Sequence, residues 1–385
     1  MLSRLRKKMQ ASTKIKGSRS PHEDIRTASE PLSTASREPN KSIGSKIVYQ
    51  ALSGHDAFRL VKLDPATDYS HTISCEVYHA SLTSVPEYEA VSYVWGLPTA
   101  REPILLRHPG SQGVEFAVGL NLEAALRALR RPDKPRVLWI DSICIDQGSH
   151  VERASQVKLM GRIYQNCTRD LLWLGSETES IQKGMDTIQS LANVDECKLS
   201  GIDQQEWNNL EASIVDNPVW TRAWIVQELF FAPKILLCRD DSLEWDDIVT
   251  VLEDNEEIKA VWTSQEKGTV FDNVMKCFGN IVTFHTIRHK AVGTRDIFSK
   301  DLLSIVVTFG KWHATLPVDK IYGLLNVAED AEDLPVDYTR SLAEVSLDFA
   351  EHTIMTGKSL LILSAAIGDP LTHTRTENKE RDLPT

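Results

Sequence analysis

Motifs that commonly identify an enzyme class are largely missing from this chain of 385 residues. No GxGxxG run follows a predicted strand, and GxxxxGK followed by Ser or Thr does not occur. Their absence excludes the common dinucleotide and P-loop phosphate cradles. HExxH, GxSxG and the protein-kinase motifs are absent as well, so nothing indicates a zinc protease, an α/β-hydrolase or a kinase. His285 and His289 have helical spacing but no third ligand near them in the sequence, and we predict no metal site.

Cysteine is scarce, and its six residues are scattered without a CxxC pair. This pattern argues against a zinc site and against a secreted disulfide scaffold. Cys144 and Cys238 lie in apolar runs, which is typical of buried free thiols. Long apolar runs are missing too, because polar residues interrupt the most apolar stretch, 223–238, and we predict no membrane span. We therefore expect a cytoplasmic protein.

Charge is unevenly distributed along the chain. Residues 1–46 hold eleven Lys or Arg and four Asp or Glu, which leaves 32 basic against 50 acidic residues, a net charge of −18, in the rest. Non-specific nucleic-acid binding needs clustered cations against phosphate, so we predict no nucleic-acid partner for this acidic body.

The basic N-terminus has two interpretations. Residues 1–22 contain no acidic residue, several Arg, Lys and Ser, and apolar residues spaced as on one helical face, as in a mitochondrial presequence. The alternative is a disordered basic tail, which the composition of residues 1–46 favours because Ser, Pro and Lys dominate throughout.

The centre of the chain alternates buried strands with amphipathic helices. Strands without polar alternation are buried on both faces, which is typical of a parallel sheet. We therefore predict an α/β fold with a doubly wound, flavodoxin-like, mostly parallel sheet, preceded by an antiparallel strand pair. The predicted strands are 58–63, 72–77, 90–95, 137–140, 171–174 and 234–238, and the predicted helices are 121–129, 180–192 and 246–252, with a helix after a capping box at 149–152.

These patterns divide the chain into four parts. We predict a disordered basic tail at 1–46, an α/β domain at 47–254 with a polar helical insertion at 196–218, a helical accessory region at 255–366, and a flexible tail at 367–385.

Three blocks of sequence resemble the fungal heterokaryon-incompatibility (HET) domain. They are residues 88–96 (YEAVSYVWG), 138–147 (LWIDSICIDQ) and 218–228 (PVWTRAWIVQE), and they occur in the family's order within residues 88–240. Residues 318–338 are similar to the tail of HET-containing proteins. Two positions depart from the pattern: the family usually has Asn at the position of Asp146, and Asp-Pro-Arg-Asp-Lys where residues 316–320 read LPVDK.

The resemblance implies an effector of self/non-self recognition that promotes cell death. HET domains are distantly similar to TIR domains, some of which cleave NAD⁺ with a glutamate in a Trp-x-x-x-Glu setting. Here that setting is Trp224 to Glu228, which makes Glu228 the candidate catalytic residue and NAD⁺ the candidate substrate, with no cofactor. Because positions i and i+4 share a helix face, Trp224 is a candidate wall of the same site. The resemblance also implies self-association and an incompatibility partner protein.

Other candidate ligand contacts follow from position in the predicted sheet. Asp141 follows a buried strand at the carboxyl edge, where open α/β sheets bind ligands. Arg153 has the chemistry to grip a diphosphate, and Trp95 and Gly96 end the first strand of the domain. The structural alternatives are a capping role for Asp141 or Asp146, an ion pair of Arg153 with Asp141, a turn at Gly96, a core position for Trp224, and a surface pair of Glu228 with Arg222 or a lysine.

Two rival interpretations of function stay open at this point. One is a non-catalytic adaptor that acts through protein association alone, which the acidic body and the missing enzyme motifs fit equally well. The other is a degenerate paralogue without activity, suggested by Asp146 and the altered 316–320 stretch.

Overall fold

A computed structural model of the chain describes residues 49–175, 179–192, 201–211, 217–238, 242–254, 300–310, 312–357 and 362. The predicted tails at 1–46 and 367–385, the presequence alternative at 1–22 and residues 255–299 of the accessory region lie outside these ranges. All described residues belong to one compact unit, Gly44–Thr385. Among them, no helix combines the length and the apolar composition needed to cross a membrane.

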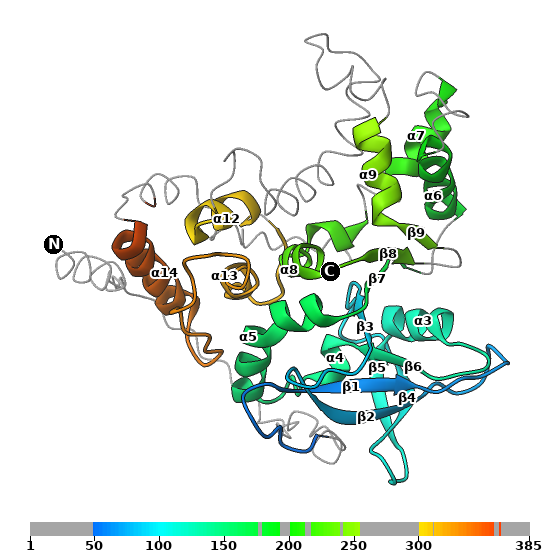
Figure 1. Cartoon of the computed structure of the whole chain (residues 1–385), viewed down its shortest axis with the longest axis horizontal. Helices are drawn as coiled ribbons and strands as arrows, with labels where there is room; N and C mark the ends of the chain where they lie inside the picture. Colours follow the sequence, from blue (N-terminus) through cyan, green and yellow to red (C-terminus); the bar gives the residue numbers. More distant parts are fainter. Residues whose placement is uncertain are drawn as a thin grey trace, which may run out of the picture. The chain divides into compact units, whose positions relative to one another are not determined.

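A single sheet carries the strands of the described residues (Figure 1), in the order β5-β4-β2-β1-β6-β3-β7-β8-β9. The strands are β1 (Ala57–Leu63), β2 (Ser74–Ser81), β3 (Glu89–Ser92), β4 (Arg101–Arg107), β5 (Val114–Gly119), β6 (Arg136–Trp139), β7 (Asp170–Trp173), β8 (Ile235–Cys238) and β9 (Ser242–Glu244).

The centre of the sheet is parallel and its flanks are mixed. Strands β6, β3, β7 and β8 run parallel to one another. Outside this group, β1 pairs with β6 and β9 pairs with β8 in antiparallel fashion. The α/β class is therefore confirmed. The N-terminal strand pair, β1 with β2, is antiparallel as predicted. It extends the main sheet, however, because β1 also pairs with β6.

Strands β4 and β5 were not predicted from the sequence. They form an antiparallel pair at the edge of the sheet. The first three residues of β4 are exposed, and the strand contains Pro103 among charged side chains, so it lacks the apolar run that identifies a buried strand. Strand β2 pairs only with Leu105–Arg107, so the first part of β4 has β5 as its one neighbouring strand and tolerates such a composition.

The helices follow their sequence signals more closely. They are α3 (Leu120–Leu129), α4 (Asp141–Cys144), α5 (His150–Asn166), α6 (Glu179–Ala192), α7 (Gln204–Leu210), α8 (Ile225–Phe231), α9 (Trp245–Asp254), α12 (Leu302–Phe309), α13 (Asp319–Tyr322) and α14 (Leu342–Gly357), with a 3₁₀ turn, η3, at Pro218–Thr221. Helix α3 buries the predicted apolar face, Leu122, Ala125, Leu126 and Leu129. Helix α5 begins at the predicted cap, where the Ser149 side chain accepts a hydrogen bond from the backbone of Glu152.

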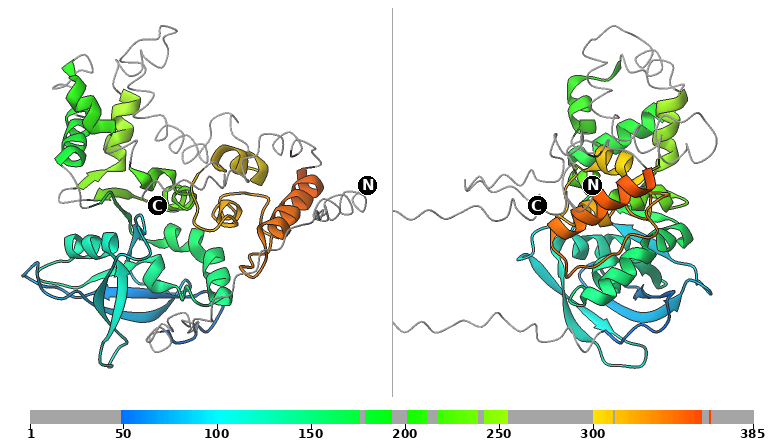
Figure 2. Two further views of the ribbon diagram at one scale, coloured as in Figure 1. Left: turned by 180° about the vertical axis from the view of Figure 1, so that it is seen from behind. Right: turned by 90° about the vertical axis from the view of Figure 1, so that its left-hand side faces the viewer.

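Residues after 310 pack directly onto the helix that follows η3. In Figures 1 and 2, α13 lies beside α8. The Gln227 side chain of α8 donates to the Gly323 carbonyl at 2.7 Å, and the Asn326 side chain donates to both Gln227 and the Val157 carbonyl of α5, each at 2.8 Å. These contacts join both sides of the domain boundary predicted at residue 254, which stays a prediction.

Candidate functional site

Three neighbouring parallel strands end at one edge of the sheet, and each is followed by polar or aromatic residues. Trp95 follows β3, and Asp141 directly follows β6 at the start of α4. The loop after β7 is tied to η3, because the Asn217 side chain donates to the Leu174 carbonyl at 2.7 Å. Arg222, next after η3, is thereby placed near the same edge.

Asp141 and Trp95 meet at this edge. The indole nitrogen of Trp95 donates to Oδ2 of Asp141 at 2.9 Å, and the backbone nitrogen of Ser142 donates to Oδ1 at 2.7 Å. Trp95 is 44% exposed, a large fraction for an indole. One oxygen of the Asp141 carboxylate thus accepts a hydrogen bond from the backbone of α4. The other accepts a hydrogen bond from Trp95, an aromatic side chain that is partly exposed to solvent. Asp141 thus lies at the carboxyl edge as the first residue of α4, and the N-cap of this helix is Ile140, without a side-chain cap hydrogen bond.

Glu228 lies in the first turn of α8 and pairs with Arg222. The guanidinium Nη1 of Arg222 is 3.3 Å from Oε2 of Glu228, and the glutamate is only 2% exposed. The pairing with Arg222 given as the structural alternative for Glu228 is therefore present, but the glutamate is buried and not at the surface. Its catalytic role stays a prediction.

Electrostatics links Asp141 to this pair. Loss of solvation by burial raises the pKa of the Asp141 carboxyl to about 6, with Arg222 opposing the rise and the negative charge of Glu228 adding to it. Burial lowers the pKa of the Arg222 guanidinium, but the nearby carboxylates Glu228 and Asp141 outweigh it and raise that pKa. The site therefore combines two carboxylates with one guanidinium, a net charge of −1 when all are ionised.

Two tyrosines complete the surroundings of this site. Tyr93 donates to the Ser142 hydroxyl at 2.6 Å, and the hydroxyls of Tyr164 and Ser92 lie 3.2 Å apart. Burial is the first cause that raises the pKa of both tyrosines well above its usual value, so both are neutral donors. We call the group Tyr93, Trp95, Asp141, Ser142, Arg222 and Glu228 the carboxylate cluster.

Arg153 and Trp224, predicted to belong to the same site, have other contacts in the structure. The Arg153 guanidinium stacks 3.5 Å above the ring centre of Tyr338. The Tyr338 hydroxyl donates to Asp319 at 2.9 Å, and the Trp224 side chain also hydrogen-bonds to Asp319. These four residues form a second group, the Asp319 cluster, which joins α5 and the start of α8 to residues 319–338. The ion pair of Arg153 with Asp141, given as the structural alternative, is not seen. The Arg153 guanidinium stacks on the Tyr338 ring instead.

Asp319 was not predicted as a functional residue. It is 8% exposed, and burial raises the pKa of its carboxyl to about 6, opposed by its hydrogen bond from Tyr338 and by the charge of Arg153. Its sequence signal was the Asp-Lys pair within residues 316–320, which resembles the family's tail but does not reveal what the aspartate contacts.

Gly96 provides the turn after Trp95. Its φ angle is +74°, in the region that favours glycine, and a Cβ added there would meet no atom within 4 Å. The turn is therefore a sufficient reason for glycine at this position. Nearby, a Cβ at Gly119 would lie 2.7 Å from the Trp95 carbonyl. The backbone of Trp95 is thus packed closely against the start of α3.

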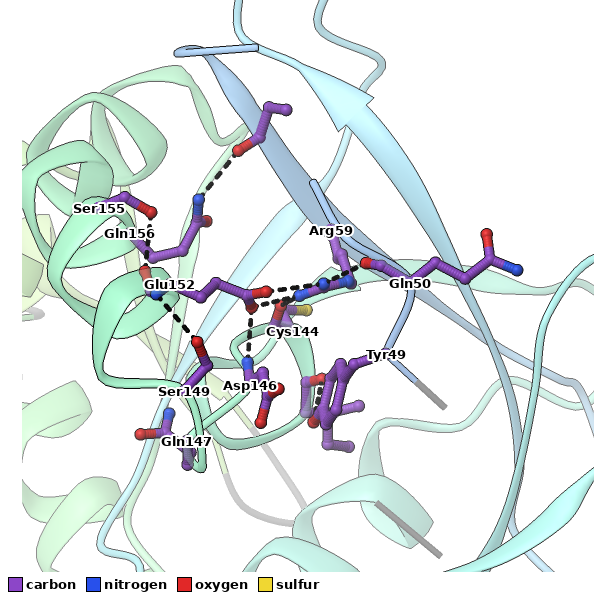
Figure 3. Close-up of polar contacts among 12 residues, drawn as sticks. Tyr49, Gln50, Arg59, Cys144, Asp146, Gln147, Ser149, Glu152, Ser155 and Gln156 are labelled. Atoms are coloured by element: carbon purple, nitrogen blue, oxygen red, sulfur yellow. Dashed lines mark hydrogen bonds and ion pairs between the residues drawn. The ribbon is translucent and has the colours of Figure 1, made fainter. Parts of the chain in front are cut away.

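A buried arginine supports the loop that carries Asp141 (Figure 3). The Arg59 guanidinium donates to both carboxylate oxygens of Glu152, at 2.5 and 2.9 Å, and to the Cys144 carbonyl at 3.0 Å. The same carboxylate accepts from the backbone nitrogen of Asp146 at 2.7 Å. Tyr49 donates to the Ile143 carbonyl at 2.9 Å. The turn from α4 into α5 is therefore fixed from behind by one bidentate ion pair.

Sequence reasoning missed this ion pair for an identifiable reason. Alternation along the first strand assigns Arg59 to the solvent face, yet its side chain is fully buried. The capping box predicted for Ser149 and Glu152 forms only in part, because the Glu152 carboxylate is taken by Arg59 and Asp146 instead. The signal for a buried ion pair was a charged residue, Arg59, with apolar residues on both sides of it in the strand.

A metal-binding cluster of three or more His, Cys, Asp or Glu side chains is not found among the described residues. The described cysteines Cys75, Cys144 and Cys167 are free and buried, and burial raises the pKa of each thiol. They therefore act as small apolar side chains rather than nucleophiles.

The part of the chain that forms the carboxylate cluster matches a known protein family. Residues 88–228 match the family model described as heterokaryon incompatibility protein (HET). This segment of the chain is thus similar to a HET domain, and the carboxylate cluster lies entirely within the matched residues. Asp319 and Tyr338 lie outside them.

One curated relative matches over most of the chain. The chain is 24% identical over 381 residues to heterokaryon incompatibility protein 6, OR allele, of Neurospora crassa. The alignment covers 84% of this chain and 56% of that protein, so the chain spans about half the length of this relative. No solved structure matches the chain.

Proposed function

We propose that this protein acts in fungal self/non-self recognition as a heterokaryon-incompatibility effector that promotes cell death from the cytoplasm. The HET match over residues 88–228 supports this role, as does the name of the Neurospora relative. Self-association and contact with an incompatibility partner protein are part of the proposal.

The order of the parallel strands supports a flavodoxin-like and TIR-like arrangement. Numbered as they occur along the chain, the four strands β3, β6, β7 and β8 lie in the order 2-1-3-4. That is the order of flavodoxin-like sheets, which bind ligands beyond the carboxyl ends of the strands, at the switch point between the first and third strands, here β3 and β7. The carboxylate cluster lies at this edge, beyond β3 and β6.

The activity we propose is cleavage of NAD⁺ to nicotinamide and ADP-ribose. The bond between the nicotinamide nitrogen and C1′ of the ribose breaks, its electron pair stays with nicotinamide, and positive charge develops on the sugar. The observation that carries the proposal is the carboxylate cluster itself: two carboxylates and one guanidinium, net −1, beside a half-exposed indole. Such a site stabilises a developing cation.

Nicotinamide release tests the proposal. Purified, artificially clustered protein is incubated with NAD⁺, beside Glu228→Gln and a matched variant, Glu89→Gln. Glu89 is also a buried carboxylate, 7% exposed and paired with Arg136 and Arg169, but it stands at the start of β3, at the opposite ends of the parallel strands.

We expect turnover in the wild type and in Glu89→Gln, and a loss of about 100-fold or more in Glu228→Gln. Absence of turnover in the clustered wild type excludes NAD⁺ cleavage. Equal turnover in all three proteins leaves an enzyme but removes Glu228 from its mechanism.

A specific observation favours the second candidate, a non-catalytic adaptor acting by protein association. Trp95, Leu97 and Leu120 are large apolar side chains that are 44%, 50% and 48% exposed, close to one another in the sequence and fold. Cell death on expression that persists in Glu228→Gln but is lost in Leu97→Asp supports the adaptor. Cell death lost in Glu228→Gln alone supports the enzyme.

A further inference from the structure

We infer that Asp141 is the carboxylate that faces the substrate, and that Glu228 acts behind it by holding Arg222. The inference rests on the proposed function, and it reverses the roles that a Trp-x-x-x-Glu pattern suggests.

Exposure separates the two carboxylates. Glu228 is 2% exposed, and its Oε2 lies 3.3 Å from the Arg222 guanidinium. Asp141 is a partly exposed residue, and its Oδ2 lies under the indole of Trp95, which is itself 44% exposed. Asp141 is therefore the more accessible of the two carboxylates, although Arg222, the partner of Glu228, is itself 15% exposed.

The Asp141 carboxylate also has capacity left for a ligand. Oδ1 accepts from Ser142 and Oδ2 from Trp95, one hydrogen bond to each oxygen. An ionised carboxylate offers about four acceptor positions. The remaining positions suit a ribose hydroxyl or a water molecule, and Trp95 offers a flat apolar face for a nicotinamide or adenine ring beside them.

The chemistry assigned to Asp141 is that of a general base. Water attacks C1′ as the bond to nicotinamide breaks, a new C1′–O bond forms, and the proton of the water passes to Asp141 and then to solvent. No oxidant, reductant or metal takes part. A base works best when its pKa lies near the working pH, and burial brings the pKa of Asp141 to about 6.

Glu228 and Arg222 then adjust, in opposite directions, the pKa that burial gives to Asp141. The titratable groups that act on this carboxyl, or are acted on by it, are Tyr93, Cys144, Tyr164, Arg222 and Glu228. Of these, Arg222 lowers the pKa of Asp141 and Glu228 raises it. Removing the charge of Glu228 leaves Arg222 unopposed, so the pKa of Asp141 moves down. A residue that only supported the fold would not produce this shift.

The test combines turnover with a reporter that is independent of turnover. The indole N–H resonance of Trp95, identified by its loss in Trp95→Phe, is followed from pH 4 to pH 8 with and without ADP-ribose. The proteins are the wild type, Asp141→Asn, Glu228→Gln and the control Asp146→Asn. Asp146 lies in the same loop, and its Oδ1 accepts from the Gly148 nitrogen at 3.0 Å, a bond that Asn reproduces.

We expect the wild-type resonance to titrate near pH 6, at lower pH in Glu228→Gln, and not at all in Asp141→Asn, and to move when ADP-ribose binds. Nicotinamide release should fall about 100-fold or more in Asp141→Asn, with ADP-ribose affinity within a few-fold of wild type, while Asp146→Asn behaves as the wild type.

Equal turnover in Asp141→Asn and Asp146→Asn overturns the role of Asp141 and leaves NAD⁺ cleavage standing. A Trp95 resonance that moves with ADP-ribose in a protein without turnover supports Asp141 as the ligand-facing group and overturns NAD⁺ cleavage. A resonance that ADP-ribose does not move overturns the inference.

Discussion

The side-chain amide of Gln227 donates a 2.7 Å hydrogen bond to the carbonyl of Gly323, nearly a hundred residues away in the sequence. Gln227 is fully buried and stands next to Glu228. The side-chain oxygen Oε1 of Gln227 accepts a hydrogen bond from the side-chain amide of Asn326. The register of α8, and with it the position of Glu228, therefore depends on residues outside the matched HET segment.

Replacing Gln227 tests this dependence. Gln227→Ala leaves the Gly323 carbonyl and the Asn326 amide without their partner in a buried place, at a cost of about 1–3 kcal/mol in the free energy of unfolding. The exposed Gln204→Ala is the control, and we expect it to lie within about 0.5 kcal/mol of the wild type. Urea denaturation followed by circular dichroism measures both, and equal midpoints for the two variants would contradict the expectation.

Breaking the pair of Arg59 with Glu152 should be far more damaging. Arg59→Met leaves the Glu152 carboxylate without its bidentate partner, and removing one member of a buried ion pair costs about 3–5 kcal/mol. The double variant Arg59→Met, Glu152→Leu removes both charges, and we expect it to recover part of the loss. Guanidinium denaturation of the two single variants and the double variant gives the coupling between the residues. Strictly additive losses would mean that the pair is not coupled.

Asp319 should make stability depend on pH in an unusual direction. The folded protein raises the pKa of this carboxyl from 3.8 to about 6, so the folded state holds the proton more tightly than the unfolded chain. The corresponding stabilisation is full below about pH 4 and is lost as the pH rises to about 6.

Asp319→Asn, which keeps an acceptor for Tyr338, should flatten this part of the profile, whereas the exposed Asp333→Asn should not. Unfolding free energies measured between pH 4 and pH 7 decide the point. A wild-type profile and an Asp319→Asn profile of the same slope would show that this carboxyl is not perturbed.

The stack of Arg153 on Tyr338 should respond to the shape of the cation as well as its charge. Arg153→Lys keeps the positive charge but loses the planar group that lies 3.5 Å above the ring centre, and we expect a loss of about 0.5–2 kcal/mol. A double-mutant cycle with Tyr338→Leu isolates the contact. The loss should vanish when Tyr338 is already absent, and persistence of the full loss would place the effect elsewhere.

The sequence predicted the parts of this protein that depend on local pattern. The apolar runs that form β6, β7 and β8 are uninterrupted, and the Ser149 cap and the α3 face follow simple spacing rules. Strand β4 was not predicted because its first three residues are exposed and it carries no continuous apolar run. The sheet is correspondingly less parallel than the apolar runs alone suggest.

The candidate site divided in two for a similar reason. Asp141 and Trp95 end neighbouring strands, a relation that sheet order predicts, and the structure brings them together. Trp224 and Arg153 were grouped with them by motif and by chemistry. Their actual partner, Asp319, lies far along the chain. Long-range partners of single polar residues leave no periodic trace, which is also why Arg59 and Glu152 were not recognised as a pair.

The strand-like bridge between Arg222 and His313 has a practical consequence. The backbone nitrogen of His313 donates to the Thr221 carbonyl at 2.6 Å, and the His313 carbonyl accepts from the Ala223 nitrogen at 2.8 Å. The backbone on both sides of Arg222 is therefore held by a segment that lies almost a hundred residues further along the chain. A chimaera of two homologous chains joined between residues 254 and 300 would therefore combine this backbone clamp and Arg222 from different parents. Exchanges of segments between homologous chains should move residues 217–231 and 312–326 together.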